Sequence, residues 1–144
     1  MATSSAYSFT SISATVDGQQ VQGLWDGDDV LLVEPGADAG SGTIGVDGSG
    51  IFSVSADRSA KITIKLMHTS PTHRLLTQKF KRQQSLGSTA AGFPFSLIDA
   101  GSGEGGSADR CFILTRPKDS KSKTATERVW VLWTADWNPE IPNG

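Results

Sequence analysis

The sequence predicts a mainly β protein, an antiparallel β-sandwich or barrel-like fold with one flanking α-helix. Its 144 residues include 16 glycines and six prolines, which divide the chain into short segments typical of strands joined by turns. Most segments are short apolar or alternating runs, and one segment carries a convincing helix start. A chain of this length fits a single domain, residues 1–144.

The first strands form a predicted hairpin. Residues 7–16 are rich in β-branched and aromatic side chains, which favour a strand. Asp17 and Gly18 follow, and this pair accepts the positive φ angles of a tight turn, so a returning strand is expected over residues 21–25. After an acidic turn, the continuous apolar run of residues 30–33 predicts a strand buried on both faces.

A loop and a second hairpin come next. Residues 34–42 contain Gly, Pro, Asp and Ser and are expected to be a loop. Asp47 and Gly48 lie between two apolar runs, a pattern typical of a hairpin turn. Residues 61–66 then alternate strictly between apolar and polar side chains, which predicts a half-buried strand.

One helix is predicted over residues 71–84. Ser70 can cap the first turn, and Pro71 fits the first helical position, where its missing N–H costs nothing. A narrow apolar stripe would face the sheet, and the rest of the helix would be solvent-exposed and basic. The basic side chains are Arg74, Lys79, Lys81 and Arg82. A solvated or protein-facing helix explains them better than a DNA-binding helix does.

The second half of the chain predicts three more strands, over residues 93–99, 110–115 and 127–134. The Gly- and Ser-rich residues 100–108 are expected to form a flexible hairpin tip, because no Gly-Lys-Ser or Gly-Lys-Thr follows as in a phosphate-binding loop. Residues 116–124 predict an exposed basic loop, and residues 137–144 predict an extended C-terminal tail.

The last long strand carries large apolar side chains on both faces. One face would cover the core and the other would contact a second chain. The predicted subunit-interface residues are Val129, Trp130, Val131 and Trp133.

No pattern of catalytic or metal-binding residues is found. His68 and His73 flank a strand-to-helix junction five residues apart, a spacing that does not bring two imidazoles to one metal ion. The acidic run at residues 26–29 lacks the rhythm and the terminal Glu of a calcium loop. Cys111 lies in an apolar run and is expected to be a buried free thiol. We therefore expect no enzyme activity, no cofactor and no metal, and the absence of a long apolar run predicts no membrane partner.

Three segments of the chain resemble the tail tube proteins of contractile-tailed bacteriophages. They are residues 43–49, residues 55–60 and residues 62–71, and weaker similarity extends to the strands around residues 7–16 and 130–133. The resemblance implies a tail tube fold and a structural virion protein. Such a protein would form stacked six-membered rings around a channel for DNA ejection into the host.

The resemblance also implies sites and partners. Residues 34–50 would stack one ring on the next, with Glu34, Asp38 and Asp47 as contacts. The basic outer face of the helix would contact a tail sheath. The protein would bind copies of itself and meet baseplate, tape measure and tail terminator proteins. It would assemble in the host cytoplasm and reside in the virion.

Acidic and basic residues are unevenly distributed along the chain. The first 57 residues hold eight Asp or Glu and no Lys or Arg, whereas all 13 Lys and Arg come later. Opposite charges on two copies would steer their docking, unless folding mixes both halves on one surface. Carboxylates repel phosphates, so a net acidic lumen drawn from the first 57 residues would let DNA pass without binding.

Two other functions fit the same sequence. A β-sandwich adhesion or carbohydrate-binding module would stack sugars on Trp25, Trp130, Trp133 and Trp137 and remain a monomer or small oligomer. A tail terminator or baseplate hub component would share the tube-like fold but cap an assembly rather than extend it.

Overall fold

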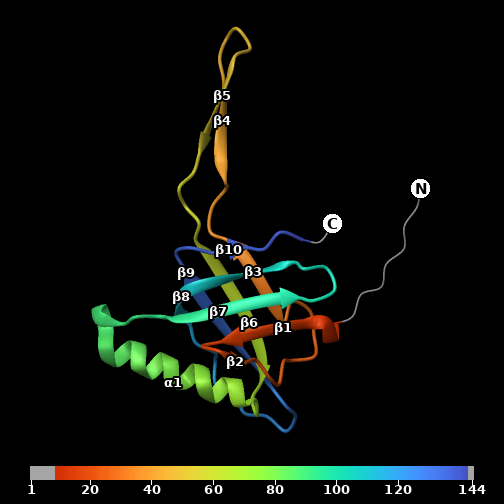
Figure 1. Cartoon of the computed structure of the whole chain (residues 1–144). Coiled ribbons are helices and arrows are strands. Elements are labelled where there is room, and N and C mark those ends of the chain that lie inside the picture. The colour runs from red at the N-terminus through yellow and green to blue at the C-terminus, as the bar shows by residue number, and fades with distance from the viewer. Residues whose placement is uncertain (1–8, 143–144) are drawn as a thin grey trace, which may run out of the picture.

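The computed structural model describes residues 9–142 and is built on one large antiparallel sheet (Figure 1). Its elements, in chain order, are η1 (Phe9–Ser11), β1 (Ile12–Val16), β2 (Gln19–Gln20), β3 (Leu31–Pro35), β4 (Gly40–Ile44), β5 (Gly50–Val54), β6 (Ala60–Met67), α1 (Pro71–Leu86), η2 (Gly87–Thr89), β7 (Phe93–Asp99), β8 (Gly105–Thr115), β9 (Glu127–Thr134) and β10 (Asn138–Pro139). The mainly β class with one α-helix is confirmed within this range. The predicted strand residues 7 and 8 and the tail residues 143 and 144 lie outside the described residues.

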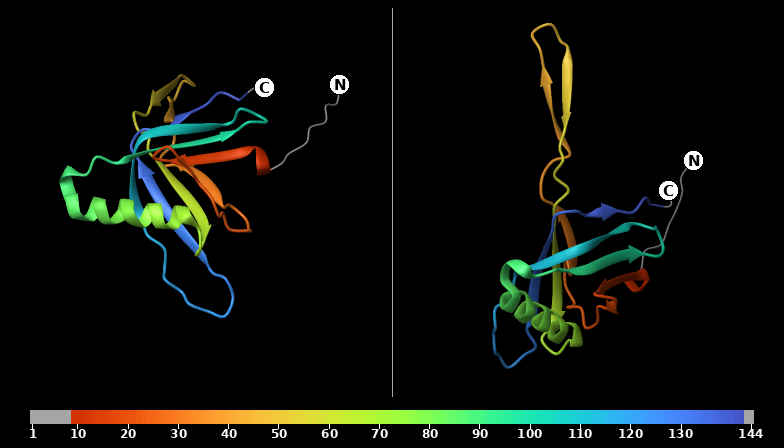
Figure 2. Two further views of the ribbon diagram at one scale, coloured as in Figure 1. Left: turned by 60° about the horizontal axis from the view of Figure 1, so that its bottom comes forward. Right: turned by 60° about the vertical axis from the view of Figure 1, so that its left-hand side comes forward.

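The large sheet is open at both ends. Its strand order is β2-β1-β7-β8-β9-β6-β3, every pair is antiparallel, and β10 pairs separately with β8. The β1 and β7 half crosses the β6 and β9 half, so the sheet is strongly bent (Figures 1 and 2). Because β2 and β3 do not pair with each other, the sheet does not close into a barrel.

The first hairpin turns where the sequence predicts. Asp17 and Gly18 have φ angles of 52° and 78°, as a two-residue turn with two positive φ angles requires. The returning strand is shorter than expected, because β2 covers only Gln19–Gln20. Beyond it the chain crosses to β6, where Leu24 forms an isolated bridge with Leu66.

Strand β6 shows the predicted alternation, with Ile62, Ile64 and Leu66 fully buried. The prediction for the neighbouring apolar run was wrong. Strand β3 is an edge strand that pairs only with β6, and its side chains are half-buried or exposed. An apolar edge strand and a fully buried strand have the same sequence pattern, so the pattern could not separate them.

Helix α1 begins at Pro71 as predicted and ends at Leu86, two residues later than expected. The Ser70 hydroxyl accepts a hydrogen bond from the Thr72 N–H at 3.1 Å and caps the first turn. Gly87, with φ of 57°, ends the helix. Leu76 is fully buried, so the helix covers the core side of the sheet.

One hydrophobic core joins the sheet and the helix. The buried residues of this core are Ala14, Val16, Val21, Ile62, Ile64, Leu66, Leu76, Phe93, Phe95, Ala108, Cys111, Ile113, Trp130 and Leu132. Burial raises the pKa of the Cys111 thiol to about 11, so the predicted buried free thiol is confirmed.

The Gly- and Ser-rich segment is only partly a loop. Residues 100–104 turn, but β8 already begins at Gly105, so the expected loop over residues 100–108 was too long. The glycines serve close packing here: a Cβ on Gly106 would lie 2.6 Å from the Trp137 ring, and one on Gly105 would lie 2.1 Å from the Leu97 carbonyl oxygen.

The basic segment 116–126 is a loop that joins β8 to β9, as predicted and two residues longer. Arg128 anchors it, although only 5% of this residue is exposed. The Arg128 guanidinium donates to the Ser120 carbonyl oxygen at 3.1 Å and lies 3.4 Å from an Asp119 carboxylate oxygen. No pattern in the sequence predicted this buried cation.

Candidate assembly surfaces

The hairpin β4–β5 projects from the body of the molecule (Figures 1 and 2). It forms its own two-stranded sheet, separate from the large one. Register places Gly40 opposite Val54, Gly42 opposite Phe52, and Gly50 opposite Ile44. Residues opposite one another in an antiparallel pair point to the same face. One face of the hairpin therefore carries three large apolar side chains above three glycines.

The other face of this hairpin is mainly hydroxylic. Ser41 pairs with Ser53, and Thr43 pairs with Ile51. The turn at the tip contains Asp47, whose carboxylate accepts a hydrogen bond from the Ser49 N–H at 3.0 Å. This backbone contact lowers the pKa of Asp47, so the tip carries a negative charge at neutral pH.

The three predicted stacking residues lie apart from one another along this region. Glu34 is exposed on β3, Asp38 is exposed in the connection to β4, and Asp47 is exposed at the tip. The excursion from the body runs on to Val54, beyond the expected limit at residue 50. Its exposed apolar residues, which were not singled out although they lie among glycines in the sequence, are Ile44, Val46, Ile51, Phe52 and Val54.

Strand β9 divides its large side chains between two faces. Trp130 is only 2% exposed and lies in the core, where its indole N–H donates to His73 Nδ1 at 3.0 Å. The structure therefore places Trp130 inside the subunit and not on its predicted interface. Val129 and Val131 are half-buried and Trp133 is 36% exposed on the opposite face.

Side chains of the neighbouring strands extend this outer face. Register aligns Val131 with Thr63 and Leu32, and it aligns Trp133 with Phe112 and Lys61. The outer β9 face is defined here as Leu32, Phe112, Val129, Val131 and Trp133. Helix α1 packs on the other side of the sheet, against Trp130, so it does not cover this face.

The basic residues of α1 are not all available to a partner. Arg74, Lys81 and Arg82 are exposed, but Lys79 forms an ion pair with Asp17 in the first hairpin turn. The Arg116 guanidinium lies 5.0 Å from the centre of the Phe80 ring, at the start of the basic loop. The acidic and basic halves of the sequence are therefore mixed at this end of the helix.

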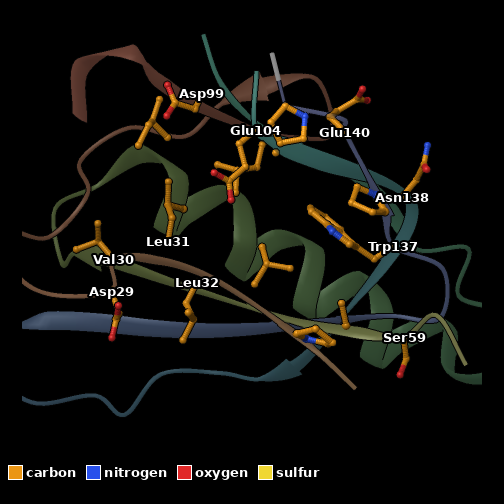
Figure 3. Close-up of a pocket in the computed structure, with 18 of the residues that line it drawn as sticks. Asp29, Val30, Leu31, Leu32, Ser59, Asp99, Glu104, Trp137, Asn138 and Glu140 are labelled. Atoms are coloured by element: carbon orange, nitrogen blue, oxygen red, sulfur yellow. The ribbon is translucent and has the colours of Figure 1, made fainter. Parts of the chain in front are cut away.

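An open groove of about 1460 Å³ lies between β3 and β10. Trp137 and Leu31 line it, and Asp99, Glu104 and Glu140 gather on one side, across from Asp29 and Leu32 (Figure 3). Within residues 9–142, no group of three or more His, Cys, Asp or Glu side chains is arranged to hold a metal ion. The groove was not foreseen from the sequence, because its lining comes from distant segments.

The four tryptophans do not form one exposed platform. Trp130 is buried, Trp25 and Trp137 are half-buried and line the groove, and Trp133 lies on the outer β9 face. This distribution weakens the carbohydrate-binding alternative. His73 packs against Trp130 and His68 is exposed in the turn before α1, so the two histidines have separate environments. In the described part of the chain, no helix has the length and apolarity to cross a membrane.

Comparison with known proteins identifies similar sequences and folds. The family model described as "Bacteriophage PhiTE tail tube protein" matches residues 2–139. The tube-terminating cap of the anti-feeding prophage has a similar fold, with a TM-score of 0.59 and 10% identity over 96% of this chain and 93% of that one. The sheath/tube terminator of an extracellular contractile injection system, PVC, in its extended state gives a TM-score of 0.66 and 12% identity over 97% of this chain and 100% of that one. No curated protein matches the sequence.

Proposed function

Because the chain belongs to the bacteriophage PhiTE tail tube protein family, we propose that it is the repeating subunit of a phage tail tube. A structural role in the tail, and so a place in the virion, follows from the family itself. Membership also favours a non-enzymatic role. The observation that carries the proposal is the family match over residues 2–139, which spans almost the whole chain.

In this proposal six copies form a ring through the open edges of the large sheet. Among residues 9–142, no strand pairs with the outer edge of β3 or with the first half of β1, because β2 pairs only with Thr15 and Val16. Unpaired edges invite strand addition, and pairing them between copies would satisfy their N–H and C=O groups. The ring would enclose the channel through which DNA is ejected.

Rings would stack through the hairpin β4–β5 and its base, with Glu34, Asp38 and Asp47 as polar contacts. The length of the hairpin and its projection from the body support this role (Figure 1). A two-stranded ribbon gains little stability alone, so contact with another copy would help to order it.

The exposed cations of α1 would contact a tail sheath. Arg74, Lys81 and Arg82 remain available, whereas Lys79 is engaged with Asp17. The channel would present neutral or acidic groups to DNA, since cations would retain its phosphates. Baseplate, tape measure and terminator proteins would complete the tail, which would assemble in the host cytoplasm.

A second candidate is a tail terminator that caps the tube. Its support is the fold shared with the tube-terminating cap of the anti-feeding prophage and with the terminator of the PVC injection system. The two candidates differ in what the protein builds by itself.

Negative-stain microscopy of the purified chain, combined with size-exclusion chromatography, tests both candidates. A tube subunit is expected to give rings and hollow cylinders of many rings. A terminator is expected to give single rings that do not stack. A monodisperse monomer at millimolar concentration would refute both.

A further inference from the structure

No residue between 9 and 142 covers the apolar face of the hairpin β4–β5. Ile44, Phe52 and Val54 are 73%, 65% and 83% exposed. The Phe52 ring lies over Gly40, where a Cβ would come within 2.6 Å of ring atoms. Large apolar side chains gathered on one face and left in water mark an interaction surface. The hydroxylic face carries Ser41, Thr43 and Ser53 and one exposed apolar side chain, Ile51, so its apolar surface is smaller.

The hairpin leaves the body at one end of the sheet. An eight-residue strand such as β6 is about 23 Å long, so the opposite end of the sheet lies about that far away. Pro35 and Ala60, at the base of the hairpin, pair with each other. Met67 and Glu127 pair at the far end of the same strands. The hairpin points away from its own body in Figure 1 and in the right-hand view of Figure 2. A second copy in the same orientation, placed beyond the hairpin tip, therefore presents its Met67 and Glu127 end to the hairpin.

The outer β9 face offers a matching surface. Val129, Val131 and Trp133 form an apolar row along the strand, and α1 leaves it uncovered. Lys61 and Lys65 of β6 lie beside this row in register with Trp133 and Val129. The hairpin tip carries Asp47, whose charge is opposite to that of Lys61 and Lys65, and one carboxylate, Glu34, lies opposite Lys61 on β3.

We propose that the apolar face of the hairpin, formed by Ile44, Phe52 and Val54, docks on the outer β9 face of a second copy in the next ring. Asp47 then lies beside the lysines of β6, and the hydroxylic face of the hairpin remains in water. The contact is heterologous, because two different surfaces meet, so it repeats without closing. This inference rests on the proposed tube function and specifies which surfaces join the rings.

Disulfide trapping between copies tests the inference. Chains carrying both Phe52→Cys and Val131→Cys are allowed to assemble and are then oxidised. Cys111 is buried and fully shielded, so it does not contribute to the crosslinks. We expect a ladder of covalent oligomers on a non-reducing gel. When chains with only Phe52→Cys are mixed with chains with only Val131→Cys, we expect dimers alone.

Two matched controls move one new cysteine away from the proposed contact. Ser53→Cys moves the thiol by one residue to the hydroxylic face of the hairpin, and Ser96→Cys replaces Val131→Cys with a site on β7. Each control pair is expected to crosslink at least about five-fold less. Equal crosslinking by a control, or no ladder in particles that microscopy shows to be stacked rings, overturns the docking and leaves the tube function standing. Absence of rings and stacks in the unmodified chain refutes both.

Discussion

Two adjacent residues of β9 are expected to affect different properties. Leu132 should affect the stability of the fold, and Val131 should affect association between copies. Leu132 is fully buried among core residues, and its neighbour Val131 points to the outer face. Leu132→Ala removes buried methyl groups and leaves a cavity, so it should lower the free energy of unfolding by about 2–5 kcal/mol. Val131→Ala trims a half-buried side chain and should cost less than about 1 kcal/mol.

These losses are measurable for a chain of this size. A loss of 3 kcal/mol should lower the melting temperature by roughly 6–12 °C. The assay is urea and thermal unfolding followed by circular dichroism, at a dilution where sedimentation shows a monomer. At higher concentration the order reverses: Val131→Ala should weaken association, whereas folded Leu132→Ala should still associate. Equal unfolding losses for the two variants would contradict the assignment of the two faces.

Three further predictions test the hairpin, the histidine and the anchored loop. Phe52→Ser should abolish assembly but change the free energy of unfolding by less than about 0.5 kcal/mol, and Ser53→Ala should do neither, as chromatography and urea unfolding will show. Burial and the nearby Arg128 charge lower the pKa of His73 below 6.5, so the folded state favours neutral imidazole. Stability should therefore fall as pH decreases from 7 through 6.5 and below, and His73→Gln should flatten this dependence in urea titrations at several pH values. Arg128→Ala should cost about 2–3 kcal/mol and speed proteolysis of the loop before β9, which constant cleavage would contradict.

Local signals predicted most of the elements. The Asp17 and Gly18 turn, the alternation of β6 and the Ser70 and Pro71 helix start each depend on neighbours in sequence, and each is found in the structure. The returning strand after Gly18 and the start of β8 were misplaced, because both depend on which distant segment comes to pair. Gly105 and Gly106 show this dependence, since they are in a strand where Leu97 and Trp137 approach closely.

The candidate surfaces were harder to predict than the fold. Trp130 and Trp133 have the same residue type on the same strand, and only strand pairing decides which one enters the core. The apolar run of β3 likewise matches a central strand, although the structure places it at an edge. Arg128 was missed because its partners, Asp119 and Ser120, come from the loop before its own strand.

The apolar face of the hairpin and the outer β9 face bear on the choice between a tube subunit and a terminator. A subunit that repeats along a filament must both donate a contact at one end and accept it at the other. A cap needs only one of these surfaces, and retaining the other would let the stack continue past it. This chain carries both an uncovered apolar hairpin and an outer β9 face that helix α1 leaves uncovered and that runs along the strands from the hairpin base toward the far end. The presence of both surfaces on one chain favours the repeating role over the capping role, despite the similarity of the fold to two terminators.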